Sequence, residues 1–290
     1  MGSLTSIASA EVTAHQGSHL EAASSAIQPG LPVFIAALPS TTADELITTA
    51  KAASALGLEP VPHLVARNMT SEEQFAYVVD RLVTEAGVER ALVLGGDRSI
   101  PAGPFSDALS LLNSGILNPQ TISKVAFGCY PEGHPKIAKA QLEKSLFAKL
   151  EIAEDLRLKT RLITQICFDA STILAFVRLL RAKGIAAPLR YGVVGPTKIT
   201  TLLKYAAVCG VGASLKTLAQ QRTLSAKLLA GYTPDALIES ISHAVQAEQD
   251  LGIIGPHFFT FGSLKRTLNW LAVRKLPNDL TSAAYSPAAV

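Results

Sequence analysis

Short runs of apolar residues alternate with longer amphipathic stretches along the whole chain. Most of the short runs are rich in aliphatic residues and are bounded by glycine, proline or polar residues, which is typical of strands that are buried on both faces. The eight strands predicted in this way cover residues 10–13, 31–38, 59–67, 90–94, 124–130, 161–169, 189–195 and 255–261.

The stretches between these runs carry apolar residues at helical spacing. In the stretch 41–56, for example, Leu46, Ala50 and Ala53 fall on one face. Ser71, followed by two glutamates, is typical of a helix N-terminus because its hydroxyl can accept a free backbone N–H. The helices predicted from the spacing cover residues 41–56, 70–86, 106–112, 138–155, 171–183, 198–208, 215–229, 233–249 and 265–275.

Every predicted strand except the first is clearly followed by a helix. Strands separated by helices pair in parallel through right-handed crossovers, and eight such units close into a (β/α)8 TIM barrel of the α/β class. The alternative is an open doubly wound sheet, but no Gly-x-Gly-x-x-Gly motif follows the first strand. No internal linker is evident. We therefore expect one catalytic barrel domain over residues 1–277 and a mobile tail over residues 278–290.

Composition narrows the class of protein. Hydrophobic residues make up 48% of the chain and charged residues 17%, which excludes a disordered chain. The net charge of +3 comes without a basic cluster, no apolar run approaches the ~20 residues of a spanning helix, and no secretory signal is seen. We therefore expect a cytoplasmic protein without nucleic-acid or membrane partners. Cys129, Cys167 and Cys209 are interpreted as buried, reduced thiols.

Polar residues gather where the predicted strands end, which is where the active site of a (β/α)8 barrel lies. Glu11, His63, Asp97, His134 and Gln165 all occupy such positions. Each has a plain structural alternative: a solvated glutamate, a core histidine, a helix cap, a turn residue and a side chain that satisfies the barrel rim. Their convergence on one end of the barrel favours function over these separate explanations. The histidines at these positions do not have the local His-x-x-x-His spacing that would indicate a metal site.

The motifs at these positions form a recognisable series. They read PHL at 62–64, LGGD at 94–97, YPEGHP at 130–135, ITQICFD at 163–169 and HFFT at 257–260. Over about residues 9–275 the chain resembles the barrel of the methylenetetrahydrofolate reductases. The resemblance implies a reductase that interconverts 5,10-methylene- and 5-methyltetrahydrofolate, with NADH or NADPH as hydride donor and FAD as cofactor.

The resemblance also implies residue roles. Glu11 matches the general acid, and Asp97 matches the aspartate beside flavin and folate. The implied FAD contacts are His63, Gly96, Asp97, Tyr130, His134 and Lys149. The implied substrate contacts are Gln165 and Phe259. A buried Glu11 could keep its proton near neutral pH and open the imidazolidine ring of the folate, while an ionised Asp97 stabilises the iminium cation.

The chain departs from the family at several flavin contacts. It has AEVTA at 10–14 where the family usually has Phe-Glu-Phe-Phe-Pro, AALP at 36–39 where Thr-Tyr-Gly is usual, and Gly95 where an arginine is common. We therefore expect FAD to bind more weakly than is typical of the family. The alternatives are a flavin-free folate reductase, a folate-dependent methyltransferase on the same barrel, or a non-catalytic folate-binding subunit. The sequence leaves open whether the chain forms a homo-oligomer.

Overall fold

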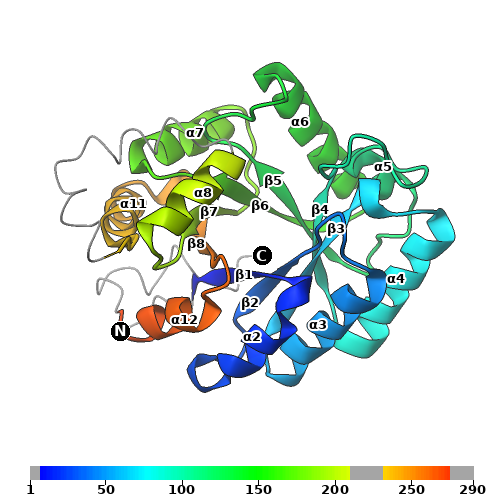
Figure 1. Ribbon diagram of the computed structural model, residues 1–290. Helices are drawn as coiled ribbons and strands as arrows, with labels where there is room; N and C mark the ends of the chain where they lie inside the picture. The colour runs from blue at the N-terminus through cyan, green and yellow to red at the C-terminus, as the bar shows by residue number, and fades with distance from the viewer. Residues whose placement is uncertain (1–6, 210–230, 275–290) are drawn as a thin grey trace.

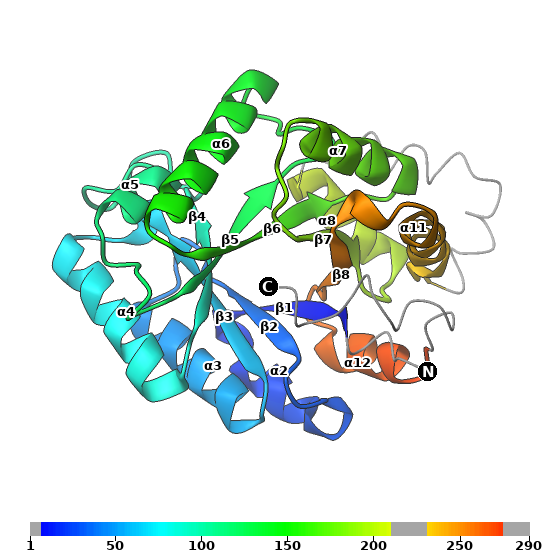
Figure 2. The same ribbon diagram turned by 180° about the vertical axis from the view of Figure 1, so that it is seen from behind.

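Eight parallel strands pair in sequence order, and the last returns to pair with the first, which closes a barrel inside a ring of helices (Figures 1 and 2). The computed structural model describes residues 7–209 and 231–274. The strands are β1 (Ser9–Thr13), β2 (Pro32–Ala36), β3 (Glu59–Val65), β4 (Arg90–Leu94), β5 (Lys124–Cys129), β6 (Lys159–Ile166), β7 (Leu189–Val194) and β8 (Ile253–Phe259). The predicted single-domain (β/α)8 barrel is confirmed.

The helices follow the strands as the apolar spacing predicts. They are α2 (Gly17–Ala22), α3 (Ala43–Ala55), α4 (Glu72–Ala86), α5 (Ala108–Asn113), α6 (Lys139–Asp155), α7 (Ala170–Ala182), α8 (Ile199–Cys209), α11 (Asp235–Ala247) and α12 (Leu264–Ala272). The first strand is also followed by a helix, α2, whose six residues are too few to show a periodic pattern. The predicted helix at 215–229 and the tail at 278–290 lie outside the described residues.

Several predicted strands extend too far at the end where the active site was expected. The strand predicted over 31–38 ends at Ala36, and the one over 59–67 ends at Val65. Leu38 is 43% exposed, because it belongs to a loop at the barrel mouth. Apolar residues that line such a loop cannot be distinguished from a strand by hydrophobicity alone.

Two of the clusters of buried apolar residues lie on opposite faces of the barrel strands, one outside and one inside. The large cluster lies between the strands and the helices, while a small cluster fills the barrel itself. The inner cluster consists of Phe34, Val61, Leu92, Ala126 and Ile163. Because side chains alternate across a strand, these residues fix which positions of β2 to β6 point into the barrel.

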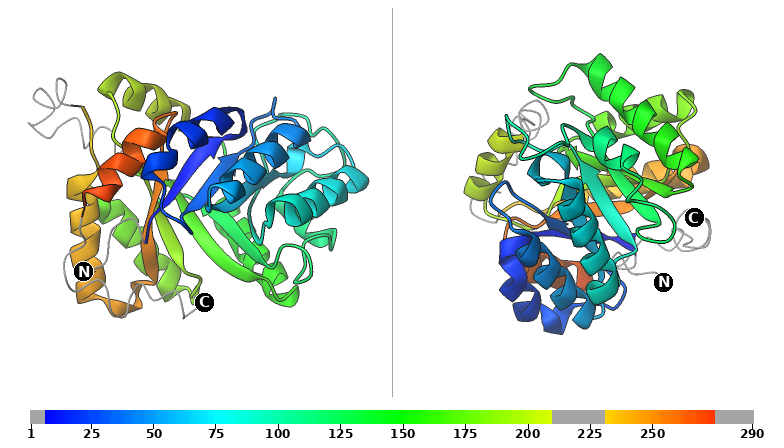
Figure 3. Two further views of the ribbon diagram at one scale, coloured as in Figure 1. Left: turned by 90° about the horizontal axis from the view of Figure 1, so that it is seen from below. Right: turned by 90° about the vertical axis from the view of Figure 1, so that its right-hand side faces the viewer.

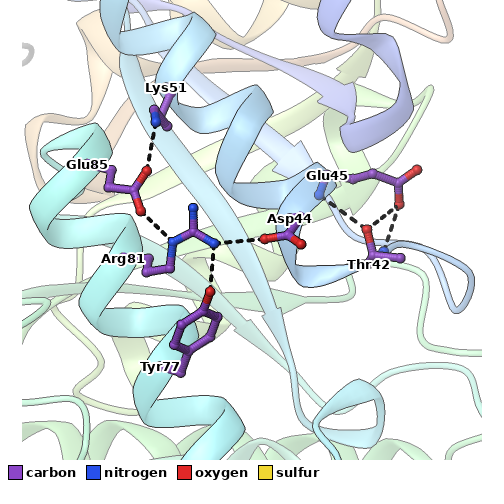
Figure 4. Close-up of polar contacts among 7 residues, drawn as sticks. All are labelled: Thr42, Asp44, Glu45, Lys51, Tyr77, Arg81 and Glu85. Atoms are coloured by element: carbon purple, nitrogen blue, oxygen red, sulfur yellow. Dashed lines mark hydrogen bonds and ion pairs between the residues drawn. The ribbon is translucent and has the colours of Figure 1, made fainter.

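Helices α3 and α4 are joined by a polar network on the outside of the ring (Figure 4). Arg81 Nη1 donates to Asp44 Oδ1 at 2.8 Å and to Tyr77 Oη at 2.8 Å, and its Nε bonds to Glu85. Lys51 Nζ donates to the same Glu85 carboxylate at 2.7 Å. The pKa of Glu85 is about 2, first because of the Arg81 hydrogen bond and then because of Lys51. This network fixes the relative position of neighbouring helices.

Helix ends confirm the capping prediction. The Ser71 hydroxyl accepts the backbone N–H of Gln74 at 3.1 Å, and α4 ends at Gly87, whose φ is 62°. A left-handed φ of this kind suits glycine and stops the helix. The free cysteines Cys129 and Cys167 are buried, as predicted, and the Cys209 side chain is not among those described.

The barrel closes at the seam between its first strand, β1, and its last strand, β8. Ser9 lies opposite His257 and Glu11 opposite Phe259. Thr260 Oγ1 donates to the Glu11 carbonyl at 2.6 Å, and α12 packs against α2 outside the seam (Figure 3). In the part of the chain that the structure describes, no helix is long and apolar enough to cross a membrane.

Candidate functional site

A cavity of about 1420 Å³ opens at the carboxyl ends of the strands and continues between α6 and α7. All the side chains singled out from the sequence line it. They are Glu11, His63, Gly96, Asp97, Tyr130, His134, Lys149, Gln165 and Phe259. The barrel topology accounts for this convergence, since the strand ends of a closed parallel barrel face one mouth.

Glu11 lies between two buried histidines. Its Oε2 is 3.4 Å from His63 Nε2 and 3.5 Å from His257 Nε2. These are ion-pair distances, and neither imidazole nitrogen makes a hydrogen bond of good geometry to a described residue. On its other side His257 Nδ1 is 2.9 Å from the Ser9 hydroxyl. Glu11 and His63 therefore line the floor of the cavity, and His257 and Ser9 lie buried behind them.

The acidity of Glu11 differs from the sequence-based expectation. Burial is the largest influence and raises its pKa, but His257 and then His63 outweigh it together and lower the pKa from 4.5 to about 2. Burial also lowers the pKa of His257 below 6.5, although Glu11 opposes that shift. The net shift is thus opposite in direction to the one that burial alone would give, and the role of Glu11 as a general acid stays a prediction.

Aromatic rings hold the histidines in place. The Phe34 ring meets His257 edge-on at 4.6 Å between centroids and His63 at 6.4 Å. Phe259 meets His257 edge-on at 4.9 Å. These contacts leave the two imidazoles little rotational freedom and keep their Nε2 atoms directed at Glu11.

A bulge in β6 directs Gln165 into the cavity. The register between β6 and β7 shifts between Ile163 and Ile166, and Thr164 Oγ1 accepts the Gly192 N–H at 2.8 Å. A Cβ on Gly192 would lie 2.4 Å from the Thr164 carbonyl oxygen, so only glycine fits there. Gln165 Oε1 accepts the Ile166 N–H at 2.9 Å, which leaves its amide nitrogen without a partner among the described residues.

The loop after β4 approaches the cavity through Gly96. Its φ is 101°, and an added Cβ would lie 2.4 Å from Val65 Cγ1, so the backbone there requires glycine. Asp97 is exposed and does not cap the next helix, since Asp107 caps α5 instead. Its carboxylate makes no ion pair with a described residue, so it is free to face a ligand.

Two arginines tie this loop to its neighbours. Arg67 donates to the carbonyl oxygens of Ser106 and Arg98 at 2.8 and 2.7 Å. Arg98 donates to Asn68 Oδ1 at 3.1 Å and to the Pro39 carbonyl at 2.6 Å. Both guanidinium groups are therefore engaged with the protein itself at the rim.

Lys149 places a largely buried cation on the α6 side of the cavity. Its Nζ lies 5.3 Å from the centre of the Phe127 ring, and burial lowers its pKa. Among the described residues no carboxylate pairs with it directly, so an anionic ligand would complete its environment. Tyr130 and His134 form an edge-on pair at 5.3 Å nearby in the chain after β5.

Sequence reasoning noted His257 as polar but assigned it no role, and it missed Ser9 and Thr164. The available signal was the same in each case, namely a polar residue inside an apolar strand. Over the described ranges, no group of three or more His, Cys, Asp or Glu side chains is placed to hold a metal ion.

Comparisons with known proteins identify the family that most of the chain matches. A family model described as methylenetetrahydrofolate reductase matches residues 24–271, a range that begins after Glu11. The curated 5,10-methylenetetrahydrofolate reductase of Buchnera aphidicola subsp. Baizongia pistaciae (strain Bp) is 30% identical over 160 residues, 53% of this chain and 50% of that protein. The match thus spans about half the length of this relative.

Among solved structures, dihydropteroate synthase from Thermus thermophilus aligns with a TM-score of 0.41 and 12% identity. The alignment covers 92% of this chain and 94% of that one. A likeness of this degree supports no argument about the site.

Proposed function

Because the chain belongs to the methylenetetrahydrofolate reductase family, we propose that it interconverts 5,10-methylene- and 5-methyltetrahydrofolate with hydride from NADH or NADPH passed through FAD. The observation that carries the proposal is the Glu11 carboxylate between His63 and His257 at the floor of a large cavity. This cluster can move a proton, which opening of the folate ring requires.

The cavity has room for the ligands. Pockets for single drug-sized molecules span roughly 300–1,000 Å³, and this one measures about 1420 Å³. Its extension between α6 and α7 is lined by Leu142, Phe147, Phe176 and Leu179. An elongated cofactor could follow that apolar wall while a pterin ring occupies the barrel mouth.

The residues present fit FAD. Lys149 offers a diphosphate a cation that no carboxylate of the described residues pairs with directly, and Gly96 lets a flat ring approach the backbone. We assign His63, Asp97, Tyr130 and His134 as further contacts, because they line the same cavity. Bound FAD would supply two-electron hydride chemistry, which no amino-acid side chain provides.

The cluster around Glu11 performs the proton chemistry. Burial already acts on Glu11 more strongly than any other influence, and a pterin ring over the mouth would exclude the remaining water. Deeper burial raises the pKa of a carboxyl group, so substrate binding would favour the protonated form of Glu11. Asp97 would stabilise the cation that ring opening produces.

Gln165 serves binding. Its oxygen accepts the Ile166 N–H, and its amide nitrogen has no partner in the described part of the chain. An amide held in this way presents a donor of fixed direction to the cavity.

The experiment that tests the proposal combines a spectrum with steady-state kinetics. Protein that is incubated with FAD and then separated from unbound cofactor should retain the flavin absorbance near 450 nm and then oxidise NADH or NADPH when methylenetetrahydrofolate is present. Two half-reactions in one site give parallel lines in double-reciprocal plots. Folate binding with no oxidation of either nucleotide would reject the reductase and indicate a non-catalytic folate-binding subunit.

One observation favours a second candidate, a flavin-free reductase. Arg67 and Arg98 are engaged with backbone carbonyls, and Gly95 stands where the family often has an arginine. The rim therefore offers a diphosphate few free cations. Intersecting double-reciprocal lines in protein without flavin absorbance would establish direct hydride transfer from nucleotide to folate.

A further inference from the structure

Three arginines lie near the beginnings of strands at the end of the barrel opposite the cavity: Arg90 of β4, Arg161 of β6 and Arg190 of β7. Arg90 precedes Leu92 by two residues, and Arg161 precedes Ile163 by two. Since Leu92 and Ile163 belong to the inner core, alternation directs both arginines into the barrel. The first layer inside the barrel is therefore cationic.

Two of these arginines are anchored. Arg90 Nε donates to Glu59 Oε1 at 3.0 Å, and Arg190 Nη1 donates to the Ile7 carbonyl. A Cβ on Gly255 would lie 2.0 Å from that same carbonyl oxygen. The glycine therefore makes room for the backbone that holds Arg190, so the arrangement is built into the fold.

The donors of this layer are not all satisfied. Arg90 is 4% exposed and Arg190 is 7% exposed. Arg90 Nη1 and Arg161 Nε are buried, and neither has a hydrogen-bond partner among the described residues. Leaving a buried donor of a charged group unpaired is costly, because the lost hydration is not replaced, so two such atoms at one place indicate a missing acceptor.

The charges are also unbalanced. Among the described residues, these three guanidinium groups make one ion pair with a carboxylate, Arg90 with Glu59, and the nearby Glu89 is paired with Lys124. Burial lowers the pKa of Arg190 to about 9 and that of Arg161 to about 10, and repulsion from the other arginines of the layer adds to both shifts. A bound anion would remove both the repulsion and the unpaired donors.

We propose that this layer binds a small inorganic oxyanion of the phosphate or sulfate class, held by Arg90 Nη1 and Arg161 Nε. Guanidinium N–H groups present fixed, planar donors that match oxyanions better than a spherical ion. The layer is reachable from solvent, since the side chains of Glu59 and Lys124 are 32% and 29% exposed. The site is separate from the cavity, which lies at the other end of the strands.

The experiment measures thermal unfolding of the full chain while sodium phosphate or sulfate is titrated against sodium chloride at equal ionic strength. We expect a saturable rise in Tm with the oxyanions only, since a ligand that binds the folded state alone stabilises it. In Arg161→Gln the dissociation constant should rise about tenfold, equal to about 1.4 kcal/mol. Lys144→Gln, which also removes one positive charge but at an exposed position of α6, should bind as the wild type does.

Two further measurements complete the test. Lys149→Gln should retain the response, which separates this site from any phosphate bound in the cavity. Crystals of the wild-type protein soaked in selenate should show an anomalous peak within hydrogen-bond distance of Arg90 Nη1 and Arg161 Nε, whether or not the variants fold. Water alone at that position, an equal response to chloride, or an unchanged response in a folded Arg161→Gln protein would overturn the proposal.

Discussion

Glu11 shows how two neighbours can reverse the effect of burial on one carboxyl group. Burial raises its pKa, yet two imidazole nitrogens at 3.4 and 3.5 Å bring the pKa to about 2. A proton on this cluster is therefore shared by the group of three side chains and does not belong to Glu11 alone.

Replacing Glu11 by glutamine should separate the two halves of the proposed reaction. Glu11→Gln keeps the size of the side chain but cannot deliver a proton, so folate reduction should fall by about 10²–10⁴-fold. Nucleotide oxidation by the flavin-loaded protein should stay within about twofold of wild type, since hydride transfer to the flavin does not use this proton. Stopped-flow absorbance at the flavin band measures both. An equal loss in the two halves would contradict the assignment.

At the scale of elements, the bulge in β6 depends on a residue of the next strand. Gly192 of β7 leaves space for the carbonyls of Thr164 and Gln165, to which an added Cβ would approach within 2.4 and 2.9 Å. The direction of Gln165 is therefore set across a strand pair and not within its own strand.

Gly192→Ala should destabilise the fold by about 1–3 kcal/mol, because the new methyl group meets backbone that cannot move freely. Gly128→Ala on β5 is the matched control, since its Cβ would find its nearest neighbours at 3.6 and 3.7 Å, an ordinary contact distance. Urea unfolding of the two variants gives the comparison. Equal free energies of unfolding would show that the bulge relaxes without cost.

Helix α7 follows β6 in the chain and is capped at its N-terminus by Asp169. Its carboxylate accepts the Thr172 N–H at 3.0 Å and the Ser171 N–H at 3.4 Å. Asp169→Ala should lower the free energy of unfolding by about 1 kcal/mol, whereas Asp169→Asn, which keeps a capping oxygen, should lose less. Urea unfolding measures both variants, and an alanine variant as stable as wild type would show that the cap contributes nothing.

At the scale of the whole molecule, the free energy of unfolding should decrease as the pH is lowered through two separate ranges. The pKa of His257 is lower in the folded state than its ordinary 6.5, so the unfolded chain binds that proton first and stability declines as the pH drops through about 6.5. The pKa of Glu11 is lowered from 4.5 to about 2 in the folded state. The stability that this shift provides is therefore lost as the pH drops from about 4.5 to about 2.

Replacing His257 by glutamine should weaken the pH dependence of stability in the upper of these two pH ranges. Urea unfolding between about pH 5.5 and 7.5 should show a smaller slope of stability against pH than in wild type. The control is His243→Gln, an exposed histidine of α11, which should leave the slope unchanged. If the two variants have the same slope, the dependence comes from other groups.

The barrel could be predicted from the sequence because its strands are buried on both faces and therefore appear as continuous apolar runs. The gathering of Glu11, His63, Asp97 and Gln165 in one cavity followed from the topology alone. The partnership of Glu11 with His257 could not be predicted, since it depends on how two distant strands align at the seam. The β6 bulge and the buried arginines depend on neighbours across strands in the same way.

The seam between β1 and β8 has a consequence for how the protein is made. Glu11 leaves the ribosome 246 residues before His257 (257 − 11), an interval of about 12–50 s at 5–20 residues per second. Until β8 arrives, β1 has an open edge and the Glu11 carboxylate lacks one of its two imidazoles. During this interval the unpaired edge of β1 can pair with other chains and lead to aggregation. Strand β8 both covers this edge and supplies His257 to the cluster around Glu11.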